Sequence, residues 1–200
     1  MFGVTPRSLS VWLVAILLLG AAVAIPANTS PAAWDSLAPN AALEAEHFSS
    51  LEQAAASADL IVVAMASETR LTRTVGSGPE TIQFAELDLS VSRYIKGSFR
   101  SSEPEVISME YLVGALGTKP EVEWPGQRAL FLLRQKRGSP TSEMFPAPID
   151  ESRLYRLVSS QGLSVDNQGV ALVPLTDPGK YKASVESMTF EDAVQLAAKS

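Results

Sequence analysis

Few residues of this chain have the types and spacing that catalysis or metal binding requires. His47 is the only histidine, and there is no cysteine. A Ser-His-Asp arrangement would have to use His47, and no Gly-x-Ser-x-Gly motif lies near it. A tetrahedral zinc site built from nitrogen and sulfur atoms needs several His or Cys ligands. We therefore predict no catalytic residue, no metal ligand and no cofactor site, and the chain is not expected to be an enzyme.

Acidic residues leave one catalytic alternative open. Glu103 and Glu105, and likewise Glu121 and Glu123, are i, i+2 pairs close to prolines. A glycosidase needs two carboxyl groups at a set separation, so a secreted carboxylate-dependent hydrolase is kept as an alternative. The run 166–169 (DNQG) lacks the spaced acids and final Glu of a calcium loop. It predicts a hairpin turn instead.

Two aromatic residues are the best candidates for partner binding. Trp124 lies in a Gly/Pro-containing loop at 114–126, and Phe145 lies in a second loop at 138–148. Small barrels bind ligands with their loops and one open face. We predict that Trp124 and Phe145 contact a partner; the alternative is that each ring packs into the end of the barrel.

The N-terminus has the pattern of an export signal. Arg7 precedes the apolar run Val11 to Ile25, which contains the small residues Ala22 and Ala24. A spanning helix needs roughly 20 apolar residues, and this run has 15. We predict a signal peptide at 1–24, with an uncleaved N-terminal anchor as the alternative. The protein is then secreted or extracytoplasmic in the cell envelope, and it touches a membrane only through an uncleaved N-terminal segment.

Composition narrows the range of partners. The chain has 16 Lys and Arg against 22 Asp and Glu, a formal net charge of −6. Nucleic acid affinity comes largely from Lys and Arg on phosphates, and anionic lipid likewise attracts basic segments. We expect neither partner, and without cysteines the fold must rest on its apolar core.

Patterning divides the chain into a flexible linker at 25–47 and a single domain at 48–200. The predicted fold is mainly β, a small OB-like, partly open Greek-key barrel with a short N-terminal helix and a C-terminal helix. Expected elements are a helix capped by Ser50, strands near 60–75, 80–95, 107–113, 128–134, 153–158 and 169–174, turns at 159–162 and 166–169, and a helix capped by Thr189. A change of phase predicts a bulge at 85–86, and Lys96 is expected to be a solvated charge ending its strand.

Three segments resemble a known group of barrels. They are 58–64 (ADLIVVA), 91–97 (VSRYIKG) and 126–132 (GQRALFL). Their order is similar to the OB-like barrel of the tissue-inhibitor-of-metalloproteinase and netrin-module group, and more closely to uncharacterised exported bacterial domains of that layout. The resemblance covers about residues 50–175 and implies the fold. The inhibitors chelate protease zinc through an N-terminal Cys, which this chain lacks, so inhibition is not implied.

Together these features predict an exported, non-catalytic domain that binds a protein or a cell-envelope component. Besides the hydrolase, a membrane-tethered structural or stress-response domain is the other alternative.

Overall fold

The computed structural model describes residues 47–75, 77, 82–97, 106–113, 126–135, 154–174 and 179–200. The predicted signal peptide, nearly all of the predicted linker, the four paired glutamates, Trp124 and Phe145 lie outside these ranges.

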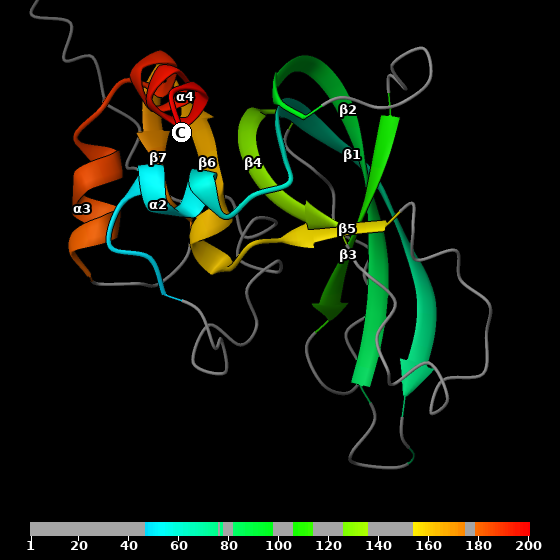
Figure 1. Ribbon diagram of the computed structural model, residues 1–200. Coiled ribbons are helices and arrows are strands. Elements are labelled where there is room, and N and C mark those ends of the chain that lie inside the picture. Colours follow the sequence, from blue (N-terminus) through cyan, green and yellow to red (C-terminus); the bar gives the residue numbers. More distant parts are fainter. Residues whose placement is uncertain are drawn as a thin grey trace, which may run out of the picture.

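Five strands form a closed barrel (Figure 1). They are β1 (Leu60–Val75), β2 (Ile82–Lys96), β3 (Val106–Val113), β4 (Arg128–Gln135) and β5 (Leu154–Leu157). Their order is β1-β2-β3-β5-β4, and pairing of β1 with β4 closes the ring. The β3–β5 pair is parallel and the others are antiparallel. The predicted mainly-β, OB-like barrel is confirmed, and it is closed where a partly open one was expected.

A hairpin extends the sheet beyond β4. β6 (Leu163–Asn167) pairs with β4, and β7 (Val170–Leu172) pairs with β6. The loop between them is Gln168 and Gly169, both with positive φ (53° and 90°), as a two-residue type I′ turn requires. The predicted hairpin turn is therefore confirmed. β6 itself lies between two predicted turns, where no strand was expected.

Helices pack on one side of the barrel (Figure 1). α2 (Leu51–Ala56) is capped by Ser50, whose side chain accepts from the Gln53 N–H. α4 (Phe190–Ala198) is capped in the same way by Thr189. Both helices confirm the prediction. α3 (Lys180–Glu186) was not expected, because its N-cap is Gly179 and no acidic residue lies in its first turn. No helix in the described ranges is long and apolar enough to cross a bilayer.

The described part of the chain has two apolar cores. The first fills the barrel with inward residues of the strands, including Leu87, Met109 and Phe131. The second lies between the outward side chains of β1 and β4 and the helices. Its residues in β1 and β4 are Ile61, Val63, Leu130 and Leu132, which we call the helix-covered face. Because both sides of these strand segments are buried, they are continuously apolar, as predicted.

The change of phase in β2 lies elsewhere than predicted. Ala85, Leu87, Leu89 and Val91 all contribute to the barrel core, with no interruption at 85–86. The register of β2 shifts at Ser92, so that Tyr94 packs on the core after Val91. The predicted bulge at 85–86 was wrong. Phe84 is apolar but points outward, and Ala85 points inward, so the alternation of β2 continues without a change of face.

Lys96 also differs from the prediction. Its Nζ donates to the carbonyl oxygens of Ala55 (3.0 Å) and Ala56 (3.2 Å) at the end of α2. A cation there satisfies carbonyls that have no partner within the helix. Gly97 follows with φ +78°, and a Cβ at this position would lie 2.7 Å from the Asp59 carbonyl oxygen. Thus the Lys96-Gly97 pair joins the end of β2 to α2.

Candidate functional site

The structure places few of the predicted site residues. His47 is exposed at the start of the described ranges. Trp124, Phe145 and the paired glutamates fall outside them, so their predicted roles and the hydrolase alternative stay predictions. Within the described part of the chain, no three or more His, Asp or Glu side chains are grouped so as to hold a metal ion.

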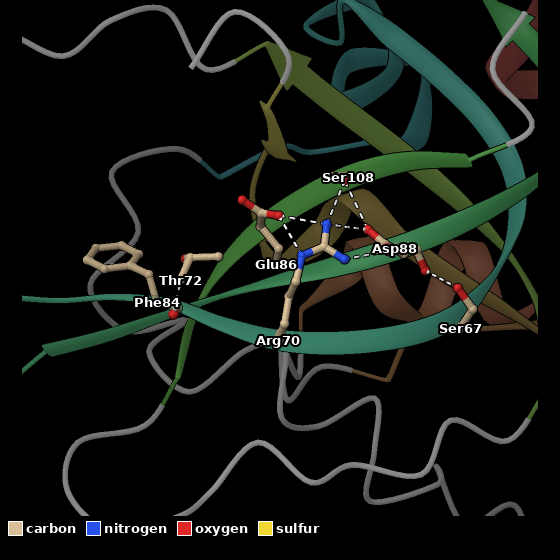
Figure 2. A network of polar contacts seen from close by, with 7 residues as sticks. All are labelled: Ser67, Arg70, Thr72, Phe84, Glu86, Asp88 and Ser108. Carbon is tan, nitrogen blue, oxygen red and sulfur yellow. Dashed lines mark hydrogen bonds and ion pairs between the residues drawn. The ribbon is translucent and has the colours of Figure 1, made fainter. Parts of the chain in front are cut away.

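A charged network on the outside of the barrel is the strongest candidate site (Figure 2). Arg70 of β1 reaches across to Glu86 and Asp88 of β2. Its Nη1 and Nη2 donate to the two oxygens of Asp88 (2.7 and 3.0 Å). Its Nε and Nη2 donate to Glu86 Oε2 (3.1 and 2.9 Å). Such fork-shaped pairing fixes a guanidinium more firmly than a single contact does.

Hydroxyl groups complete the network. The Ser108 hydroxyl of β3 donates to Asp88 Oδ1 at 2.9 Å, and the Ser67 hydroxyl donates to the Asp88 carbonyl oxygen at 3.0 Å. Asp88 is thus held from both neighbouring strands. The network spans β1, β2 and β3, and its polar atoms are positioned before any partner arrives.

A bulge in β1 puts Arg70 in this position. Ala66 pairs with Leu89 and Thr69 pairs with Leu87, so Ser67 and Glu68 together face Asp88. Before the bulge, even-numbered residues of β1 point into the barrel; after it, Thr69 is opposite the inward Leu87 and Arg70 is opposite the outward Glu86. One extra residue reverses the alternation of a strand. If the same sequence paired with β2 without a bulge, Arg70 would lie opposite Ala85 and point inward.

Electrostatics keep the network ionic and accessible. Hydrogen bonding to Asp88 is the main cause that raises the pKa of Arg70 above its ordinary value, against an opposing effect of burial. The Arg70 side chain is 50% exposed, and those of Glu86 and Asp88 are 14% and 16% exposed. The two carboxylates and one guanidinium sum to one negative charge. Glu110 pairs with Glu86 in the register and adds a third, buried acid.

Apolar side chains lie beside the network. Met65, Ser90 and Val106 form one cross-strand row on the outside of β1, β2 and β3. Met65 is 40% exposed and Val106 is 48% exposed. We call the set the β1–β3 outer face; it consists of Met65, Ser67, Arg70, Glu86, Asp88, Ser90, Val106, Ser108 and Glu110.

The barrel interior offers little reactive chemistry in the described part of the chain. Its buried core residues are apolar apart from the Tyr111 hydroxyl. Burial raises the pKa of Tyr111, so this phenol is neutral at ordinary pH. The polar groups of the described strands that can meet a ligand therefore lie outside the barrel.

The sequence analysis did not predict this site, although part of it could have been found. Alternation in β2 puts Glu86 and Asp88 on one face, opposite Leu87 and Leu89. The contribution of Arg70 was missed, because its side depends on the bulge at Ser67 and Glu68.

Comparison with known proteins adds no relative: no protein-family model, no curated protein and no solved structure matches this chain. The likeness to the inhibitor and netrin-module group stays a prediction, since a small barrel alone does not identify that group.

Proposed function

We propose that this chain is an exported, non-catalytic domain that binds a basic segment of a protein or other cell-envelope component through its β1–β3 outer face. The observation that carries the proposal is the Arg70 network, a preorganised charged group on the side of the barrel away from the helices. Ligands of OB barrels commonly lie on the outer surface of the second and third strands, and β2 and β3 supply most of this face.

Charge and shape define the partner's chemistry. Arg70 uses Glu86 Oε2 and both oxygens of Asp88, and the excess charge of the network is negative. The exposed Glu68 in the bulge adds to that excess, and the whole chain is acidic. A Lys- or Arg-bearing partner is therefore attracted over distance. Met65 and Val106 favour apolar residues beside the basic ones.

A defined peptide tests this partner class. We would measure fluorescence anisotropy of a labelled peptide of alternating Lys and Leu with the full chain, and of a Glu-Leu peptide as the negative control. Binding should be selective for the Lys peptide and weaken as salt is added. Replacing two acids, Glu86→Gln with Asp88→Asn, should weaken it roughly tenfold, about 1.4 kcal/mol.

The matched control changes net charge equally on the helix side. Glu52→Gln with Glu191→Gln also removes two acids, both exposed, and should leave the affinity nearly unchanged. Equal losses in the two double variants would mean that only net charge matters, and the proposed face would be wrong. Trp124→Ala and Phe145→Ala in the same assay test whether the predicted loop aromatics add to the contact.

A further inference from the structure

We infer that Gln161 fixes the point where the N-terminal part of the chain joins the domain, on the helix side, so that a surface attached immediately before Phe48 meets the helices and leaves the β1–β3 outer face directed away. The inference rests on the proposed function only for what the face binds. The orientation itself is measurable without a partner.

We call the contact between the buried side chain of Gln161 and the backbone of Phe48 the joint. Gln161 is 2% exposed. Its Oε1 accepts from the Phe48 N–H at 2.6 Å, and its Nε2 donates to the Phe48 carbonyl oxygen at 3.0 Å. The Tyr181 hydroxyl donates to the Gln161 carbonyl oxygen at 2.6 Å. An amide offers a donor and an acceptor together, so Gln161 holds Phe48 as a neighbouring strand would.

The segment after Phe48 is held equally firmly. Leu51, Ala54 and Ala55 of α2 are buried in the second core, and Phe48 packs against it. Lys96 binds the end of α2. The described N-terminal end therefore cannot shift without opening buried contacts, and it leaves the domain beside η5 (Ser160–Gly162), with α4 also against α2.

The β1–β3 outer face lies on another side of the molecule. None of its residues belongs to the second core. Figure 1 shows α2, α3 and α4 gathered at one side, while β1, β2 and β3 extend on the other. The C-terminus also ends among the helices (Figure 1). Both ends of the described domain thus lie on the helix side.

Energy transfer to a lipid surface tests the orientation. The full chain has no native cysteine, so His47→Cys gives one attachment point for phosphatidylcholine vesicles that carry a maleimide lipid and an acceptor dye. A donor dye is placed at residue 195, on exposed α4, or at residue 106, on the outer face, through a ketone-bearing amino acid. We expect higher transfer from position 195 than from position 106.

Variants at the joint sharpen the result. Gln161→Ala should reduce the difference between the two positions, and Gln161→Glu, which keeps the acceptor for the Phe48 N–H, should reduce it less. Equal transfer from both positions in the otherwise native chain, or higher transfer from 106, would overturn the inference even if Gln161→Ala fails to fold. Peptide binding by the unattached chain reports on the proposed function separately.

Discussion

The two outward-facing sides of this barrel carry different residue types. On the helix-covered face, Ile61 and Val63 of β1 and Leu130 and Leu132 of β4 are at most 1% exposed. On the β1–β3 outer face, Arg70 is half exposed and bonds to Glu86 and Asp88. Both faces belong to one sheet, and β1 contributes to each, first with aliphatic and then with charged residues.

The comparison shows that the outward side chains decide which face the rest of the chain covers. Burial of aliphatic side chains is favourable, at about 25 cal/mol per Å², whereas an ion network loses hydration when it is covered. Helices therefore pack over the aliphatic half of β1 and not over the charged half. The following variants test this difference, from the largest expected effect to the smallest.

Truncation on the helix-covered face should have the largest effect. Leu132→Ala removes a fully buried side chain from the second core and should cost ~2–5 kcal/mol. Met65→Ala on the outer face, where the side chain is 40% exposed, should change stability by about 0.5 kcal/mol or less. Urea unfolding of both variants measures this, and similar losses would contradict the comparison.

Glycines at positive φ test how closely the covered side is packed. Gly97→Ala combines a φ of +78° with a 2.7 Å approach to the Asp59 carbonyl oxygen and should cost about 3 kcal/mol or more. Gly169→Ala has a φ of +90° and open space around the new Cβ, so it should cost only about 1–2 kcal/mol. Thermal unfolding ranks the two, and the reverse order would show that the Asp59 backbone shifts easily away from Gly97.

Alkaline pH should lower the stability of the fold, because Tyr181 is buried in the second core. Burial, and secondarily the charge of Glu52, raises the pKa of Tyr181 above its ordinary value of 10. The folded state then holds this proton more tightly than the unfolded state does, so the stabilisation is complete below pH 10 and is lost as pH rises above it.

Tyr181→Phe should lower stability at neutral pH by about 1 kcal/mol, because it removes the hydrogen bond to Gln161. It should also lessen the loss above pH 10. Some loss remains, since burial raises the pKa of Tyr111 and Tyr155 too. Unfolding curves over this pH range give the result, and an unchanged pH dependence would argue against burial of the phenol.

The smallest expected effect is an increase in the free energy of unfolding, at Ser164. The Ser164 hydroxyl is fully buried and has no hydrogen-bond partner within the described part of the chain. Ser164→Ala removes an unsatisfied group and should stabilise by up to about 1 kcal/mol. Ser159→Ala is the control, because its hydroxyl accepts from the Gln161 N–H and its loss should destabilise. Denaturant midpoints distinguish the two signs.

Sequence patterning predicted the elements well where the apolar period was strong. The continuous apolar runs of β1 and β4 and the caps Ser50 and Thr189 were recognisable locally, and the barrel followed from them. β6 and α3 were missed, because the first is short and lies between turns and the second has no side-chain cap.

The candidate site depends on contacts between distant residues. Glu86 and Asp88 share a face by simple alternation, but Arg70 lies 16 and 18 residues away from them in sequence. Their meeting is set by the β1–β2 register, which local sequence does not reveal. The role of Lys96 was hidden for the same reason, since its partners in α2 are 40 and 41 residues away.

The extra residue at Ser67 and Glu68 makes β1 tolerant of a change in length at that point. Both side chains are exposed, so substituting either one changes little of the packing. Deleting either one would leave the other opposite Asp88 as in a regular ladder. Thr69 and Arg70 would then keep their places opposite Leu87 and Glu86. A deletion at a neighbouring position of β1 instead exchanges the sides of the residues next to it. Deletion scanning across this stretch should therefore give its highest folded yield at positions 67 and 68.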